Sequence, residues 1–243
     1  LDIFNIYPNK LNLFDMIITL QLSKKYTRRF FLSKILNIFS PFTLIEMSRK
    51  TDNRLLSSKK KILYLDGYWQ SQNYFKEFRD DIIKIFNFNE LVHKQMNIDL
   101  LKKVNFKNDV CLNVRRTDHL NLKEFNVITE KYYDNSINFY LKNNTNTKFF
   151  VFSDDIEWCK KKFFDKDKFT IIDHNYSGMK FKNYLYLMSN FRNFIIPNST
   201  FAWWGAWLSK QNNKNVLVPR RWSGNLNEKD LDIIVDDWIK VEN

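Results

Sequence analysis

The sequence predicts an α/β protein whose second half forms a parallel β-sheet wrapped by helices. From residue 110 onwards, short apolar runs that suit strands alternate with longer amphipathic stretches that suit helices. Such alternation is typical of parallel sheets, which bind ligands at the carboxyl ends of their strands. With 44% hydrophobic and 17% aromatic residues in 243, the chain can bury a substantial core. One large or two small domains are expected.

The first 104 residues have a less regular pattern. The elements expected there are, in order, a helical stretch over residues 14–42, an exposed loop over 48–61, a strand over 61–66, and helices over 72–88 and 89–103. Ser71 has the residue type and the place of a helix N-cap. Polar residues 105–108 predict a boundary between one domain of residues 1–104 and a second of residues 105–243.

The second half alternates with short connections. Strands are expected over residues 110–114, 148–152, 169–173, 194–197 and 216–219, and helices over 129–142, 154–164, 180–189 and 198–208. Residues 231–241 suit a strand or a helix.

The net charge of +12 favours an anionic partner such as a nucleotide, a nucleic acid or an acidic membrane surface. Residues 1–104 carry 18 Lys and Arg against 10 Asp and Glu, so most of the excess lies there. An RNA-binding protein is one interpretation, but the chain has no aromatic RNP pattern and no basic helix. No apolar run approaches the ~18 residues that a membrane helix needs.

The cysteines indicate the cellular compartment, and the first residues indicate whether the sequence is a fragment. Cys111 and Cys159 each fall inside an expected element, which favours reduced core thiols in a cytoplasmic protein over a disulfide. The chain begins at Leu1, and residues 1–7 lack a basic leader and a cleavage site. We therefore expect a fragment that is truncated at its N-terminus.

The stretch Asn198 to Leu208, Asn-Ser-Thr-Phe-Ala-Trp-Trp-Gly-Ala-Trp-Leu, follows an expected strand and starts an expected helix. Ser199 or Thr200 can cap this helix, which leaves first-turn amides for an anion such as a phosphate. Trp203 and Trp207 are one helical turn apart, so they share a face and are expected to pack in the core.

Two further strand ends carry charged side chains. Arg115 and Arg116 follow the first strand of the second half, and guanidinium groups bind phosphate oxygens in pairs. The pair suits a diphosphate clamp, or equally a surface pair held by Asp118. Asp154 and Asp155 follow the next strand, with Glu157 at capping-box spacing from Asp154. One of them is expected to cap a helix, and the other to bind a base, a ribose or a divalent metal.

These motifs together resemble glycosyltransferase family 11, the bacterial-type α-1,2-fucosyltransferases. The motifs are, in order, Asp66 to Phe75, then Arg-Arg-x-Asp, Phe-Ser-Asp-Asp-Ile-Glu-Trp-Cys, Leu-Tyr-Leu-Met-Ser and Asn-Ser-Thr-Phe-Ala-Trp-Trp-Gly-Ala-Trp-Leu. The resemblance implies a GT-B-like pair of Rossmann-type domains, with the C-terminal one binding the nucleotide sugar. It also implies GDP-fucose as donor, no required metal or other cofactor, and inverting transfer of L-fucose to the 2-hydroxyl of a terminal galactose in a surface glycan or its precursor.

The resemblance carries functional residues over to this chain. Arg115 and Arg116 match the arginines that grip the diphosphate, and Asp154 and Asp155 match an acidic pair of the donor site, toward guanosine. The full set expected to bind the donor is Asn113, Arg115, Arg116, Ser153, Asp154, Asp155, Ser199, Thr200 and Phe201. Arg115, Arg116 and Asp118 are expected to be catalytic, with Asp118 either the general base or the counter-ion of the arginines.

Departures from the family pattern support a second interpretation. Asn113 replaces a histidine, Thr117-Asp118-His119 replaces Gly-Asp-Tyr, and the Gly-Gly-x-Gly-Asn-Gln segment usual upstream is absent. A catalytically inactive remnant that binds a glycan or a nucleotide sugar is therefore the alternative function. His119 is interpreted as a bystander, because the three histidines show no metal-ligand spacing. The basic loop over residues 49–61 suggests peripheral contact with anionic lipid on the inner face of the cytoplasmic membrane.

Overall fold

The computed structural model describes Phe4 and residues 42–46, 50–53, 57, 62–66, 69–225 and 231–243. The chain divides into two compact units. One comprises Leu1–Ile6, Asp80–Lys229 and Ile234–Asn243, and the other Tyr7–Arg79 and Asp230–Ile233. The helix predicted over residues 14–42 lies outside the described residues, except that Phe42 begins a strand.

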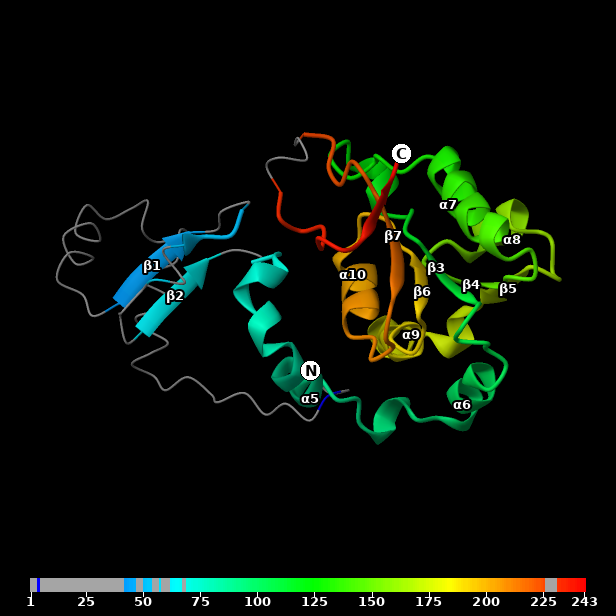
Figure 1. Cartoon of the computed structure of the whole chain (residues 1–243), viewed down its shortest axis with the longest axis horizontal. Coiled ribbons are helices and arrows are strands. Elements are labelled where there is room, and N and C mark those ends of the chain that lie inside the picture. The colour runs from blue at the N-terminus through cyan, green and yellow to red at the C-terminus, as the bar shows by residue number, and fades with distance from the viewer. Residues whose placement is uncertain are drawn as a thin grey trace. The chain divides into compact units, whose positions relative to one another are not determined.

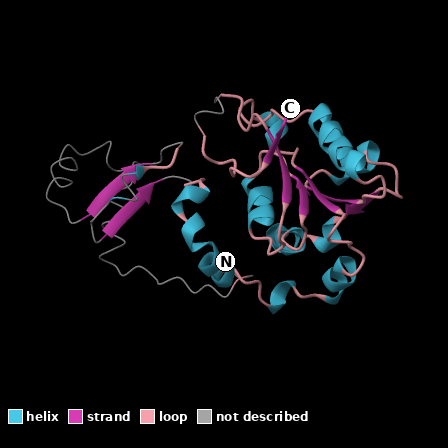
Figure 2. Cartoon of the chain, viewed as in Figure 1, coloured by secondary structure: helices cyan, strands magenta, loops and turns pink. Residues whose placement is uncertain are grey.

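The larger unit contains a six-stranded sheet in which every pairing is parallel (Figures 1 and 2). Its strands are β3 (Val110–Val114), β4 (Phe149–Ser153), β5 (Phe169–Ile172), β6 (Asn193–Ile195), β7 (Asn215–Pro219) and β8 (Ile239–Val241). All residues of β3 and β4 are buried, as in the centre of a sheet covered on both faces. The parallel α/β prediction is confirmed, and the C-terminal segment forms a strand.

The strand order, β5-β4-β3-β6-β7-β8, contains one reversal of direction. The chain runs outward from β3 to β5 and then returns to pair β6 with the free side of β3. In such sheets, ligands bind in the crevice between the two loops that leave the strands where the order reverses. The fold therefore directs attention to the residues that follow Val114 and Ile195.

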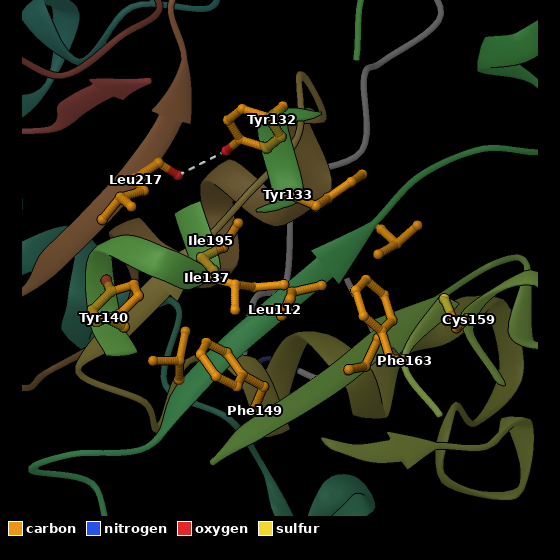
Figure 3. Close-up of a cluster of buried hydrophobic side chains, with 13 residues drawn as sticks. Leu112, Tyr132, Tyr133, Ile137, Tyr140, Phe149, Cys159, Phe163, Ile195 and Leu217 are labelled. Carbon is orange, nitrogen blue, oxygen red and sulfur yellow. Dashed lines mark hydrogen bonds between the residues drawn. The ribbon is translucent and has the colours of Figure 1, made fainter. Parts of the chain in front are cut away.

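Two helices, α7 (Glu130–Asn143) and α8 (Ile156–Lys162), cover one face of the sheet. Figure 3 shows the buried cluster they form with side chains of β3, β4, β6 and β7. The Tyr132 hydroxyl donates to the carbonyl oxygen of Leu217 (Figure 3) and to that of Ile196, and so ties α7 to β7 and to the residue after β6. The cysteine prediction is confirmed, since Cys111 and Cys159 are buried free thiols. Burial raises the pKa of Cys159 to about 12.

The other face carries α9 (Lys182–Met188) and α10 (Thr200–Trp207), which pack on each other (Figure 1). Trp203 and Trp207 are buried with stacked rings, 5.9 Å between centroids, as predicted from their spacing. Gly205 lets the helices approach, because a Cβ there would lie 3.0 Å from the Met188 Cε atom. The aromatic helix is thus fixed against α9.

Short helical turns complete the larger unit. They are η3 (Glu90–Val92), α6 (Gln95–Leu101), η4 (His119–Asn121), η5 (His174–Tyr176) and η6 (Met179–Phe181). The single helix predicted over residues 89–103 is therefore wrong in extent. Lys94 is extended, with φ −73° and ψ 147°, and it separates η3 from α6.

The smaller unit contains the parallel pair β1 (Phe42–Glu46) and β2 (Ile62–Asp66), and β2 matches the strand predicted over residues 61–66. Ser71 caps η1 (Gln72–Tyr74), where its side chain accepts from the Asn73 amide. The long helix predicted over residues 72–88 is wrong: η1 is followed by η2 (Lys76–Phe78) and then by α5 (Arg79–Ile85), which belongs to the larger unit from Asp80 onward. The break comes at Phe75, whose φ of −148° is not helical.

The exposed loop predicted over residues 48–61 is described at residues 50–53 and 57. There the prediction is wrong at Asp52, which is buried and whose amide donates to the Tyr74 hydroxyl at 2.7 Å. Thr51 donates its amide and its hydroxyl to the Asp232 carboxylate, each at 2.7 Å. Within the described ranges, no helix is long and apolar enough to cross a membrane.

Candidate functional site

The loop after β3 presents two arginines that are both paired with aspartates. Arg115 contacts Asp118 at 2.7 Å through Nη2 and Asp154 at 3.2 Å through Nη1. Arg116 contacts Asp155 at 3.1 Å through Nε, and its guanidinium carbon lies 4.1 Å from the centre of the Trp158 ring. The side chains of Arg115 and Arg116 remain 34% and 25% exposed. Both guanidinium groups are therefore held in place yet accessible from solvent.

Asp154, at the end of β4, fixes the backbone of this arginine loop. Its carboxylate accepts hydrogen bonds from the amides of Arg116 and Thr117, at 3.0 and 3.2 Å, and from the Thr117 hydroxyl. The side chain is 8% exposed. Because the parallel strands β3 and β4 end side by side, an aspartate after one can bind the amides after the other.

Asp155, and not Asp154, caps the helix, so the capping-box spacing between Asp154 and Glu157 did not identify the capping residue. Asp155 is the N-cap of α8, and its Oδ1 accepts from the Trp158 amide at 3.1 Å. Ser153, buried at the end of β4, accepts the Asp155 amide through its hydroxyl at 2.9 Å. The prediction that one of the two aspartates caps the helix is confirmed, whereas the binding of a base or a ribose by the other stays a prediction.

Asn113 lies inside the sheet one residue before the end of β3. Its side chain is buried, and Nδ2 donates to the Phe152 carbonyl oxygen at 3.2 Å and contacts the Met188 sulfur at 3.9 Å. Asn113 therefore faces α9 and links the ends of β3 and β4. This places it beneath the arginine loop.

The turn after β6 differs from the arginine loop. Ser199 is the N-cap of α10 by its backbone, but its side chain makes no capping hydrogen bond. Thr200, the first helical residue, is exposed, and Phe201 is partly buried. Asn198 anchors the turn, because its Nδ2 donates to the carbonyl oxygens of Phe125 and Trp222 at 3.0 and 2.9 Å. The first-turn amides of α10 thus have no side-chain oxygen of Ser199 as partner.

A small hollow that is partly open to solvent lies beside the arginines. Its lining includes Arg115, Arg116, His119, Tyr133 and Trp158. Tyr133 is 3% exposed, and its hydroxyl has no hydrogen-bond partner. Burial raises the pKa of Tyr133 well above its usual range, so this hydroxyl stays neutral and can donate.

Neighbouring charges and burial shift the pKa values of Asp118 and His119. The hydrogen bond from Arg115 lowers the pKa of Asp118, which therefore stays ionised at neutral pH. Burial lowers the pKa of His119, although the nearby Asp118 carboxylate opposes the effect. Two arginines face three aspartates here, so the formal charges of the cluster sum to −1 before any ligand binds.

The structure thus brings five predicted residues together in two ion-paired groups, Arg115 with Asp118 and Asp154, and Arg116 with Asp155. The Arg116 amide links the groups through its hydrogen bond to Asp154. Ser199 to Phe201 follow β6, the strand next to β3. Thr117, Trp158 and Asn198 have roles here that sequence reasoning did not assign. The place of Trp158 near the site could have been predicted, because it lies three residues after the capping Asp155.

No three His, Cys, Asp or Glu side chains in the described part of the chain are grouped so as to hold a metal ion. Asp154 and Asp155, the pair considered for a metal, are engaged with arginines and amides.

Comparisons with known proteins add a second line of information. The model for glycosyl transferase family 11 matches residues 14–242. An alpha-1,2-colitosyltransferase of Escherichia coli is 31% identical over 228 residues, which cover 87% of this chain and 75% of the relative. The O-antigen biosynthesis glycosyltransferase WbnK of Escherichia coli is 30% identical over 187 residues, 73% of this chain and 60% of the relative.

A more distant relative comes from an animal. A protein of Caenorhabditis elegans named as a galactoside 2-alpha-L-fucosyltransferase is 26% identical over 174 residues, 65% of this chain and 46% of the relative. The match thus spans less than two thirds of the length of this relative and of WbnK.

Proposed function

The chain belongs to glycosyltransferase family 11, and on this premise we propose that it transfers L-fucose from GDP-fucose, with inversion, to the 2-hydroxyl of a terminal galactose in a surface glycan or its precursor. One observation carries the proposal. In a parallel sheet of this family, two accessible arginines leave β3 at the point where the strand order reverses, beside the N-terminus of α10. A diphosphate is the group that such a site suits best.

The mechanism follows from where charge develops. Fucosyl transfer passes through an oxocarbenium-like state while negative charge builds on the departing GDP. Arg115 and Arg116 would meet that charge with fixed positive charge, and the first-turn amides of α10 would donate hydrogen bonds. Arg116 contacts Asp155 through Nε alone, so its Nη donors remain for a phosphate. Arg115 is paired through both Nη atoms, so a phosphate bound there would compete with Asp118 and Asp154. Asp118, with a side chain 54% exposed, is the partner that can leave.

The other predicted donor residues have distinct parts in this proposal. Asp154 positions the arginine loop, and Asp155 orients Arg116 while it caps α8. Ser199, Thr200 and Phe201 form the edge that closes on the phosphates. Ser153 and Asn113 hold the ends of β3 and β4 beneath the donor.

The wider architecture is also part of the proposal. A GT-B-like arrangement, in which residues 1–104 form the acceptor-side domain and residues 105–243 bind the donor, would bring the acceptor to the carboxyl edge of the sheet. The reaction would take place on the cytoplasmic side, with peripheral contact to an anionic membrane where lipid-linked glycans are extended. The basic residues of the N-terminal part support such contact.

A second candidate donor is GDP-colitose. It is favoured by the relative named as an alpha-1,2-colitosyltransferase, which matches 87% of this chain. Colitose is fucose without its 3-hydroxyl, so the same diphosphate clamp would serve either sugar. Competition between the two donors at equal concentration, with both products quantified, separates the two candidates.

The test uses the full-length protein with GDP-fucose and a panel of galactosides, followed by determination of the product linkage. We expect an α-1,2-linked product. GDP binding without transfer or donor hydrolysis would support the alternative, an inactive remnant that binds a nucleotide sugar. RNA binding that is lost with salt, while GDP binding persists, would exclude a nucleic-acid function.

The arginine variants test the site itself. Arg115→Ala and Arg116→Ala should each lower transfer about 100-fold or more, the usual effect of removing one group that stabilises developing charge. The matched control is Arg192→Ala, because Arg192 precedes β6 at the opposite edge of the sheet. Unchanged turnover in both site variants, with the fold intact by circular dichroism, would contradict the diphosphate assignment.

A further inference from the structure

We infer that His119 is the general base that takes the proton from the acceptor hydroxyl, and that Asn198 orients its ring. This inference rests on the transfer proposed above. His119 begins η4, directly after the arginine loop, and it lines the same hollow as Arg115 and Arg116. Its ring stacks on Phe125, with 5.3 Å between centroids and 27° between planes. The imidazole is therefore held beside the groups that bind the leaving diphosphate.

Two buried polar atoms without partners point to the orientation of this ring. They are Nδ1 of His119 and Oδ1 of Asn198. The Asn198 amide group cannot be reversed without loss, because its Nδ2 already donates to two carbonyl oxygens. Its Oδ1 is thus a fixed acceptor in the turn after β6. Unpaired buried polar atoms are costly, so a donor is expected to serve it.

His119 Nδ1–H is the donor that fits. Asn198 is near enough to the ring to favour its protonated form, although the contact does not close to a hydrogen bond. A small rotation of the ring would close it. With the proton on Nδ1, the lone pair is on Nε2. Of the two ring nitrogens, Nδ1 is the one found buried without a partner, so Nε2 is left to face a substrate.

The other titratable side chains of the hollow do not suit a base. Arg115 and Arg116 stay protonated, and Tyr133 stays neutral because burial raises its pKa. Glu130 forms an ion pair with Lys162 at 3.0 Å. Asp118 is next to the hollow, but the hydrogen bond from Arg115 makes it a weaker base by lowering its pKa.

The charged groups that face His119 come from two segments, the loop after β3 and the end of β4. Asp118 and Asp154 raise its pKa, Arg115 lowers it, and burial, the largest effect, lowers it as well. The net direction is down, so the ring is neutral and able to accept a proton at neutral pH. A base whose pKa lies somewhat below the working pH is well suited to proton abstraction.

The step balances as follows. The acceptor oxygen forms a bond to the anomeric carbon of fucose while the bond from that carbon to the GDP oxygen breaks. The bonding electron pair leaves with GDP, whose added charge is met by Arg115 and Arg116. The hydroxyl proton moves to Nε2 of His119, and the imidazolium later releases it to water.

The test compares His119→Phe, which keeps a ring to stack on Phe125, with His93→Phe as a matched control on an exposed histidine. Transfer, donor hydrolysis and GDP affinity are measured from pH 5 to 9 in the full chain. For the unaltered protein, kcat/KM should fall on the acidic side as His119 becomes protonated. His119→Phe should lose at least 100-fold in transfer and lose that acidic limb, while GDP affinity changes less than threefold. His93→Phe should keep both.

Two further measurements separate a base from a residue that only packs. Added imidazole should partly restore transfer in His119→Ala, and Asn198→Ala should move the acidic limb. If His119→Phe keeps its rate and its acidic limb while the unaltered protein transfers fucose, the inference is overturned and the proposed function stands. If the unaltered protein neither binds GDP nor transfers, both are overturned.

Discussion

The loops after β3 and β6 leave neighbouring strands but differ in how their polar groups are paired, and hence in how they would meet the proposed diphosphate. In the loop after β3, each arginine is already paired with one or two aspartates. In the turn after β6, the Ser199 hydroxyl caps nothing, and Asn198 and the buried tryptophans hold the backbone. In the proposed complex, a phosphate on Arg115 would compete with two aspartates, whereas the first-turn amides of α10 have no such competitor in the Ser199 side chain.

The two aspartates that contact Arg115 differ in burial, and this difference explains why replacing one of them with a phosphate would cost little free energy. Asp154 is nearly buried and binds backbone amides, so it stays with the loop in either state. Asp118 is more than half exposed, and an exposed ion pair contributes little to stability. A phosphate can therefore displace Asp118 while Asp154 keeps the guanidinium in position.

The largest effect is expected from Asp154→Ala. Removing this carboxylate leaves the amides of Arg116 and Thr117 without acceptors and Arg115 without its inner partner. We expect a loss of about 2–3 kcal/mol in the free energy of unfolding, measured by urea denaturation, together with a large loss of GDP affinity. Asp154→Asn, which keeps one oxygen acceptor, should lose less. If Asp154→Ala unfolds like the unaltered protein, Asp154 does not fix the loop.

The turn after β6 is tested through the packing of α10 against α9. In Gly205→Ala, the new Cβ would lie 3.0 Å from Met188 Cε and 3.2 Å from Met188 Cβ, so Met188 must shift by a few tenths of an ångström. Overpacking of this kind costs about 1–3 kcal/mol, and the better helix propensity of alanine offsets about 1 kcal/mol of it. Thermal unfolding measures the net loss. In the Met188→Ala background the same change should cost less, and an equal cost in both backgrounds would exclude this contact as the cause.

Asp118→Asn tests the exchange itself, with a smaller effect. If Asp118 is the partner that a phosphate displaces, the variant should bind GDP about two- to fivefold more tightly, since an exposed pair is worth at most about 1 kcal/mol. Calorimetric titration of GDP measures this. Because the Asp118 carboxylate raises the pKa of His119, the variant should also move the acidic limb of transfer to lower pH. Unchanged GDP affinity with transfer abolished would instead make Asp118 the base.

Much of this was predictable because the motifs sit where strands end. The alternating apolar runs predicted the parallel sheet, and the ordered motifs predicted the family, which the match over residues 14–242 confirms. Residues 72–103 were harder to predict, because non-helical backbone at Phe75 and Lys94 interrupts stretches with helical periodicity.

Contacts between segments that are distant in sequence could not be predicted from local sequence patterns. The capping-box spacing favoured Asp154 as the helix cap. Asp154 instead accepts hydrogen bonds from two amides that are 38 and 37 positions away in sequence, at the end of the neighbouring strand. His119 and Asn198 likewise come together because β6 returns to the side of β3, and no spacing along the chain shows that.

The smallest effect is expected from Ser199→Ala, compared with Thr129→Ala. Thr129 caps α7, where its side chain accepts from the Tyr132 amide, and loss of such a cap costs about 1 kcal/mol. The Ser199 side chain makes no such bond, so its removal should change the free energy of unfolding by less than about 0.5 kcal/mol. GDP affinity should show the reverse order, with Ser199→Ala weakened a fewfold and Thr129→Ala unchanged. A stability loss in Ser199→Ala equal to that in Thr129→Ala would mean that this hydroxyl serves the helix, and the turn after β6 would then be no readier for an anion than the arginine loop.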